Sequence, residues 1–251
     1  MLGFVSRVLT AKGPCLFATG QAGYIIKSSG GQLFAIDLYL SNCVERIEGN
    51  KGFKRLLPQL FSPIELKFDG IICTHAHLDH FDIDAVPEMV AQGARLFCSV
   101  GCAKLTEQYK MDYYSDDIVY VRPGDKYSAG DFEISFVNCD HGAAAPDAVG
   151  VIVKVDGKTI YEVGDSCLRL DRVEEIPGDI DVLIAPINGM FGNMNAQEVS
   201  ELAAVIKPGV TIPCHYGMFA SHGGDLKRFY DTMTEKELPF LIMQQGERYT
   251  L

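Results

Sequence analysis

The sequence predicts an α+β fold in which two mixed β-sheets pack face to face with helices outside. Two observations support this. Strand candidates dominate the first two thirds of the chain, and helices alternate with strands in the last third. Hydrophobic residues make up 47% of the 251 residues and charged residues 22%, which is typical of a globular protein with a sizeable core. There is no low-complexity linker or internal repeat, so we expect residues 1–251 to form a single domain.

The N-terminal third is rich in strand signals. Residues 22–27 and 32–37 are strand candidates, and the Ser-Ser-Gly-Gly sequence at 28–31 between them is typical of a hairpin turn. Residues 44–60 are mixed in character and predict an irregular or helical excursion. Residues 71–74 are short, β-branched and apolar, which predicts a buried strand.

The next segment predicts a helix over residues 85–92. Asp84 is a plausible cap for it, and Pro87 would fall in its first turn, where a missing N–H costs little. A strand at residues 95–100 and a helix at 102–109 are expected to follow.

The middle of the chain is again rich in strand candidates. Asp156-Gly157 is a tight hairpin turn signature between two of them. The predicted strands are residues 117–121, 132–138, 150–155 and 159–163.

The final third predicts alternating strands and helices. Asn195 followed by Glu198 resembles a capping box, and Gly209 is expected to close the same helix. The predicted order is a strand at 182–185, a helix at 196–206, a strand at 210–213, a helix at 225–235 and a closing strand at 240–243.

Charge and hydropathy limit the possible partners and location. The formal net charge is −11, which argues against a nucleic-acid partner held by a general basic surface. No apolar run reaches 18 residues, so no membrane-spanning helix is expected, and the start lacks a signal-peptide pattern. The eight cysteines include no Cys-x-x-Cys pair. We therefore expect a cytoplasmic protein with reduced thiols.

The most informative motif is Thr-His-Ala-His-Leu-Asp-His at residues 74–80, which holds three of the six histidines. Imidazole and carboxylate are the ligands of zinc, iron and manganese. His75 and His77 can face one side of the loop, and Asp79 and His80 the other. Two adjacent metal positions are therefore expected.

Further ligand candidates lie downstream. His141, Asp165 and His215 each stand just past a predicted strand. We expect the loops after these strands to gather at one edge of the sheets, so that the three side chains complete a two-metal site.

These residues together resemble the metallo-β-lactamase superfamily. Residues 20–24, Ile36-Asp37 and residues 161–165 are similar to the branch that contains L-ascorbate-6-phosphate lactonase. The resemblance implies a four-layer αββα sandwich with a dinuclear site at one edge. It further implies that His75, His77 and His141 hold the first metal, that Asp79, His80 and His215 hold the second, and that Asp165 bridges them.

A two-metal site of this kind activates water. Two cations about 3.5–4 Å apart lower the pKa of a shared water from about 15.7 toward about 7, so hydroxide exists at neutral pH. Asp79 is the candidate catalytic residue, because it could accept the proton of the nucleophile. Two divalent ions, zinc or manganese, are the expected cofactors, and iron shares these ligand types.

Substrate contacts are harder to choose. Asn188 and Tyr216 could donate to a developing oxyanion, with ordinary loop structure as an equal alternative, and His222 is either a contact or an exposed loop residue. Asp37 is expected to be a supporting carboxylate rather than a ligand. Lys104, Lys110, Arg169 and Arg172 are surface charges by default, one of which could serve an anionic substrate.

The leading functional hypothesis is a metal-dependent hydrolase acting on a lactone or ester of a small polar compound, which could be phosphorylated. A phosphodiesterase or phospholipase D-like hydrolase is the alternative. A di-iron redox protein is disfavoured, because such relatives carry glutamate at the position of His77. A non-catalytic scaffold is disfavoured by the complete ligand set. The sequence does not determine whether the chain forms a homo-oligomer.

Overall fold

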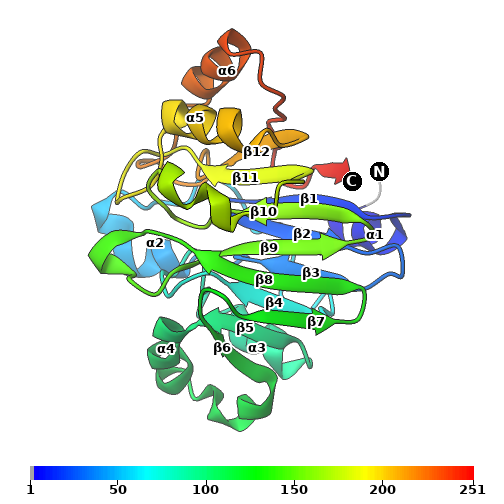
Figure 1. The fold of residues 1–251 in the computed structure, drawn as a ribbon. Helices are drawn as coiled ribbons and strands as arrows, with labels where there is room; N and C mark the ends of the chain where they lie inside the picture. Colours follow the sequence, from blue (N-terminus) through cyan, green and yellow to red (C-terminus); the bar gives the residue numbers. More distant parts are fainter. Residues whose placement is uncertain (1–2) are drawn as a thin grey trace.

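The computed structural model describes residues 3–251 and contains two β-sheets packed face to face (Figure 1). The first sheet has seven strands in the order β13-β1-β2-β3-β4-β5-β6. Neighbours from β13 to β3 pair antiparallel, and those from β3 to β6 pair parallel. Its strands are β1 (Cys15–Gly20), β2 (Gly23–Lys27), β3 (Leu33–Ile36), β4 (Gly70–Cys73), β5 (Arg95–Ser99), β6 (Ile118–Val121) and β13 (Arg248–Thr250).

The second sheet has six strands in the order β12-β11-β10-β9-β8-β7. It is parallel from β12 to β10 and antiparallel from β10 to β7, so β8, β10 and β12 all end at the same edge. Its strands are β7 (Lys126–Ala129), β8 (Phe132–Asn138), β9 (Val149–Val155), β10 (Lys158–Glu162), β11 (Val182–Pro186) and β12 (Val210–Cys214).

Helices cover the outer face of each sheet. The first sheet is packed by α1 (Phe4–Thr10), α2 (Cys43–Glu48), α3 (Val86–Ala91) and α4 (Ala103–Gln108), and the second by α5 (Ala196–Ile206) and α6 (Leu226–Glu235). Short 3₁₀ turns lie at Gly49–Lys51, Val100–Cys102, Met111–Asp117, Gly142–Ala144 and Leu170–Glu175. The expected αββα sandwich is confirmed.

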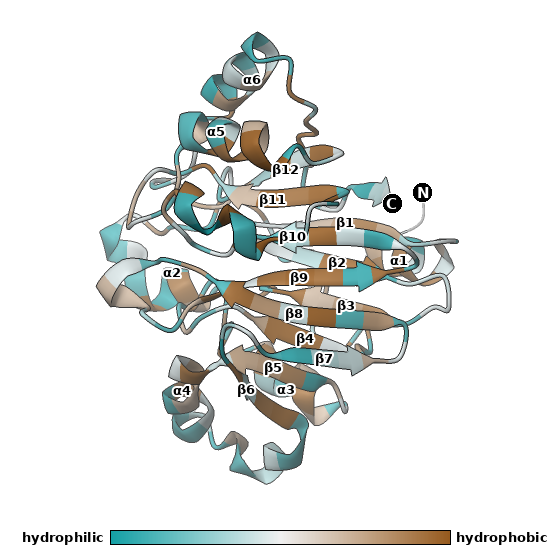
Figure 2. Ribbon diagram, viewed as in Figure 1, coloured by the Kyte–Doolittle hydropathy of each residue, from teal (hydrophilic) through white to brown (hydrophobic). Residues whose placement is uncertain are grey.

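The strands alternate their side chains between two cores. In β4, Ile71 packs on the helix side and Ile72 between the sheets, and in β10, Ile160 faces the other sheet while Tyr161 faces the helices. Strands buried on both faces need apolar residues at nearly every position, which Figure 2 shows for β9 and β11. Among residues 3–251 the longest helix is α5, with 11 residues. No helix in this part of the chain is therefore long and apolar enough to cross a membrane.

Two predictions about helix ends were wrong. Asp84 does not cap α3; it pairs with Arg46, and the Asp82 carboxylate accepts the backbone N–H groups of Asp84 and Ala85 instead. Lys207, not Gly209, takes the left-handed conformation that ends α5. Gly209 is needed for a different reason, since a Cβ there would lie 2.8 Å from the Asp181 carbonyl oxygen.

The predicted closing strand at 240–243 is also wrong. Phe240 makes only an isolated bridge with Thr211, and the chain ends in β13, which pairs with β1. Figure 1 shows β13 and α1 on the same side of the molecule. Strands β1, β7 and β13 were not predicted.

Candidate metal centre

The loop after β4 is fixed by the carboxylate of Asp37, which follows β3. Asp37 is fully buried and accepts hydrogen bonds from the Thr74 backbone N–H at 2.8 Å and the Thr74 hydroxyl at 2.6 Å. Its Oδ2 also lies 2.6 Å from His80 Nδ1, which donates to it. Asp37 therefore orients the His80 ring and leaves Nε2 facing the site, as expected for a supporting carboxylate.

A first cluster of potential metal ligands joins three loops. The ligand atoms of His75, His77, His141 and Asp165 all lie within 4.8 Å of one another. His77 Nδ1 is 2.9 Å from His75 Nε2 and 3.2 Å from His141 Nε2. The loops after β4, β8 and β10 thus bring together residues up to 90 positions apart in the sequence.

A second cluster lies beside the first. The ligand atoms of Asp79, His80 and His215 also lie within 4.8 Å of one another. Asp165 contacts both clusters, because its Oδ1 is 2.7 Å from His215 Nε2 and its Oδ2 is 3.7 Å from His141 Nε2. The carboxylate of Asp165 therefore stands where a bridging ligand would stand.

The donor atoms fit divalent metal ions. Three buried atoms that face the shared space have no hydrogen-bond partner in good geometry: His80 Nε2, His215 Nε2 and Asp165 Oδ1. Buried nitrogen and oxygen atoms are costly to leave unpartnered. Two groups of imidazole and carboxylate donors, open toward one another, match the ligand preference of zinc, iron and manganese.

The protonation states of the first cluster also suit ligation. Burial, reinforced for His75 by the neighbouring His80, lowers the pKa of His75, His77 and His141, so these rings are neutral at pH 7. Burial alone would raise the pKa of Asp165, but His215 and His80 hold it well below its usual range. Neutral imidazole and ionised carboxylate are the forms that bind metal.

Gln21 supports the second cluster and was not predicted to do so. Its Nε2 donates to Asp79 Oδ2 at 2.9 Å and lies 3.0 Å from His215 Nδ1, and its carbonyl accepts the His215 backbone N–H at 3.0 Å. Gln21, Asp37 and His215 all have positive φ angles, of 56°, 47° and 59°. The role of Gln21 depends on contacts with Asp79 and His215, which are remote in the sequence, so no local pattern indicates it.

The Beta-lactamase superfamily domain model matches residues 39–216 of the chain. The chain belongs to this superfamily. All seven candidate ligands of the two clusters fall within the matched segment of the metallo-β-lactamase fold.

Relatives narrow the family further. A UPF0173 metal-dependent hydrolase of Pyrococcus furiosus is 30% identical over 245 residues, covering 92% of this chain and 97% of that protein. One of Pyrococcus abyssi is 28% identical over 244 residues, with the same coverage of both chains. The chain is thus a member of the UPF0173 metal-dependent hydrolase family. The fold is shared with Igni18, a metallo hydrolase of Ignicoccus hospitalis, at a TM-score of 0.70 and 22% identity over 95% of this chain and 98% of that one.

The metallo-β-lactamase-type site opens into a cavity of about 550 Å³. Asn188 and His222 line it, as do Asp79 and Asp165. Tyr216 does not. Its hydroxyl donates to the Met243 carbonyl, and its ring lines a separate cavity, so the geometry gives no support to an oxyanion contact from Tyr216.

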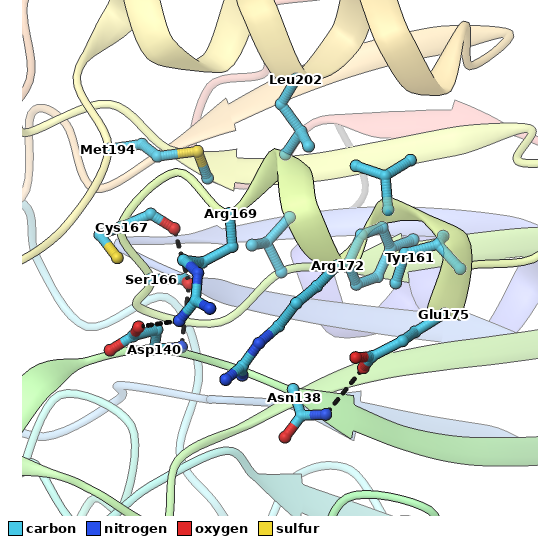
Figure 3. Close-up of a pocket in the computed structure, with 13 residues that line it drawn as sticks. Asn138, Asp140, Tyr161, Ser166, Cys167, Arg169, Arg172, Glu175, Met194 and Leu202 are labelled. Carbon is cyan, nitrogen blue, oxygen red and sulfur yellow. Dashed lines mark hydrogen bonds and ion pairs between the residues drawn. The ribbon is translucent and has the colours of Figure 1, made fainter.

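The cations considered from the sequence do not line this cavity either. Among residues 3–251, Lys51 is the one lysine or arginine on its wall, and it pairs with Glu48 at 3.2 Å. Arg169 instead forms ion pairs with Asp140 and Asp171 beside a neighbouring cavity of about 30 Å³, as Figure 3 shows for Asp140. That volume holds roughly one or two waters rather than a substrate.

Hydrogen bonds beside the Arg169–Asp140 ion pair connect the loops that carry His141 and Asp165. The Asp140 backbone N–H donates to Ser166 Oγ at 3.0 Å, and the Cys167 N–H donates to the Asp140 carbonyl at 2.9 Å (Figure 3). Because Asp140 precedes His141 and Ser166 follows Asp165, these bonds fix two candidate ligands relative to each other. Cys139 adds a contact from its thiol to the Asp165 carbonyl at 3.0 Å.

Glu162 is a buried carboxyl group that the sequence analysis did not single out. It lies at the end of β10, and neither of its side-chain oxygens has a hydrogen-bond partner. Burial, together with the nearby negative charge of Asp37, raises its pKa well above the usual value. Glu162 therefore keeps its proton to a higher pH than an exposed glutamate does.

Proposed function

We propose that this chain is a hydrolase that binds two divalent ions, zinc or manganese, and uses them to cleave an ester or lactone. In this proposal His75, His77 and His141 hold one ion, Asp79, His80 and His215 hold the other, and Asp165 bridges. The single observation that carries it is the convergence of these buried donor atoms into two groups, each within 4.8 Å, with Asp165 contacting both.

Asp79 and Asn188 each have a defined role in this proposal. Two divalent ions held by these residues would supply hydroxide at neutral pH and polarise the substrate carbonyl. Asp79 is partly exposed to the cavity and is oriented by Gln21, so it can accept the proton of the nucleophile. Asn193 donates to Asn188 Oδ1 at 3.1 Å, which leaves the Asn188 amide nitrogen for a substrate oxygen.

A carbonyl substrate is favoured over a phosphodiester. Among residues 3–251, the wall of the cavity offers one lysine, already paired with Glu48, and no arginine for the bidentate contacts that phosphate groups often receive. The similarity of residues 161–165 to the L-ascorbate-6-phosphate lactonase-like branch supports lactone hydrolysis as the reaction type.

The test is an Asp165→Asn variant assayed for metal content and turnover. We expect it to lose most of its bound metal and at least about 100-fold in kcat/KM on a panel of lactones and aryl esters, because a bridging carboxylate would be neutralised. Asp231→Asn, on the exposed face of α6, is the matched control and should keep both. Full metal loading and full turnover in Asp165→Asn would refute the proposal.

A further inference from the structure

One side of the cavity is formed by four rings, Phe53, Phe191, Phe219 and His222, which we call the aromatic wall. Phe53 is at its centre, with ring centroids 4.6 Å from His222, 5.4 Å from Phe219 and 5.9 Å from Phe191. Phe191 and His222 are also 5.3 Å apart. Three segments that are remote in sequence thus contribute to one continuous aromatic surface.

A hydrogen bond from His222 to the backbone of Lys51 holds the aromatic wall in place. His222 Nε2 lies 2.8 Å from the Lys51 carbonyl, which can only accept, so this nitrogen donates and the ring is fixed. Gly52 allows the close approach, because a Cβ there would lie 3.0 Å from His222 Nε2. The turn before Phe53 and the loop after β12 are therefore locked together across the mouth of the cavity.

Part of the aromatic wall remains exposed to solvent in the folded protein. Phe191 is 54% exposed and has a φ angle of 57°, a conformation that bulky residues rarely adopt. Met190 beside it is 40% exposed. Burying such a ring is favourable, and exposed apolar patches in a cavity mark binding sites. Phe191 thus points to a ligand that completes its burial.

The rest of the lining mixes apolar side chains with Gln21, Glu48, Lys51, Asn188 and Asn193, and it offers little positive charge to an anion. Val44, Ala76, Leu78 and Ala144 line the cavity together with the aromatic wall. The Lys51 charge is offset by Glu48, and the chain carries a net charge of −11. A phosphate on the substrate would find no second lysine or arginine on this wall.

We propose that the aromatic wall binds a flat apolar group, so that the substrate is an uncharged ester or lactone carrying an aromatic ring. This rests on the proposed function, and it replaces the expectation of a polar, phosphorylated substrate. The ring lies against Phe53 and Phe191 while the carbonyl reaches the two ligand clusters at the floor of the same cavity.

The test compares two neutral lactones on the metal-loaded protein: dihydrocoumarin, which carries an aromatic ring, and δ-valerolactone, which does not. Phe191→Ala is expected to lower kcat/KM for dihydrocoumarin about tenfold or more, and to lower it far less for δ-valerolactone, since one ring contact and its burial are lost. Tyr113→Ala is the control, because Tyr113 is 90% exposed and lies outside the cavity.

A second readout does not depend on turnover. Binding of 2-naphthol, measured by ligand-observed NMR, should weaken about tenfold in Phe191→Ala and stay unchanged in Tyr113→Ala. If neither lactone is cleaved but 2-naphthol binding follows this pattern, the proposed function fails and the aromatic site stands. If dihydrocoumarin and δ-valerolactone lose activity equally, or 2-naphthol does not bind, the inference is overturned.

Discussion

His75 and His80 have ring centroids only 4.1 Å apart, yet their pKa values move in opposite directions. For His75, burial dominates and lowers the pKa well below 6.5. Burial acts in the same direction on His80, but Asp37, then Asp165 and Asp79, outweigh it and raise the pKa well above 6.5. One carboxylate behind His80 accounts for much of the difference between the two rings.

This asymmetry predicts that the two metal positions load with different pH dependence. A proton must leave His80 before it can bind metal, whereas His75, His77 and His141 are already neutral at pH 7. Uptake at the second position should therefore release a proton and weaken first as the pH falls through neutrality. Calorimetric titration of zinc in buffers of different ionisation enthalpy measures this release, and identical pH dependence at both positions would contradict it.

A second prediction at this scale concerns Glu162. Its folded-state pKa is raised above the unfolded value of about 4.5, so the unfolded chain ionises first as the pH rises. The contribution of Glu162 to stability is thus fully present below about pH 4.5 and declines as the pH rises toward the folded-state pKa. In the metal-free protein, Glu162→Gln should flatten this decline, measured as urea midpoints at pH 5 and pH 8. Glu235→Gln, an exposed position, should keep the wild-type slope.

At the scale of the element, α5 depends on its capping box. Asn195 Oδ1 accepts the N–H groups of Gln197 at 2.9 Å and Glu198 at 3.1 Å, and Glu198 accepts the Asn195 N–H at 2.8 Å. Loss of such a cap costs about 1 kcal/mol. We expect Asn195→Ala to lower Tm by about 2–4 °C, measured by calorimetry. Val205→Ala, exposed on the same helix, is the control, and an equal Tm in both variants would argue against the cap.

The elements that the sequence predicted well are those with local signals. The capping box located α5, and Asp156-Gly157 located the turn between β9 and β10, where both residues have positive φ. Strand β1 was missed because its sequence, with threonine, alanine and a final glycine, lacks β-branched alternation. The short β13 exists through its pairing with β1, which no local pattern reveals.

At the scale of the whole molecule, aromatic rings join the two sheets. Phe34 of β3 and Phe132 of β8 have centroids 4.4 Å apart, and both are fully buried. Removing such a ring typically costs about 3–5 kcal/mol. Phe132→Ala is expected to lower the free energy of unfolding in urea by this amount, with Tyr113→Ala as an exposed control. A change below about 1 kcal/mol would mean that the sheets do not depend on this contact.

Some residues of the candidate site can be predicted from local sequence patterns, whereas others depend on contacts between remote segments. The seven candidate ligands could be proposed from a dense motif and three strand ends. Gln21, Glu162 and the aromatic wall could not, because each acquires its role only when remote segments meet. Tyr216 looked equivalent to Asn188 in the sequence, but its hydroxyl turns toward Met243.

The positive φ angles of Gln21, Asp37 and His215 have an evolutionary consequence. Each non-glycine residue held this way costs about 1–2 kcal/mol, which glycine would largely recover. Glycine at Gln21 or His215 would relieve this strain, but it would remove the side chain that orients Asp79 or a candidate ligand, and at Asp37 it would break the buried hydrogen bonds to Thr74 and His80. The strained residues are therefore kept by selection on the site rather than by selection on stability.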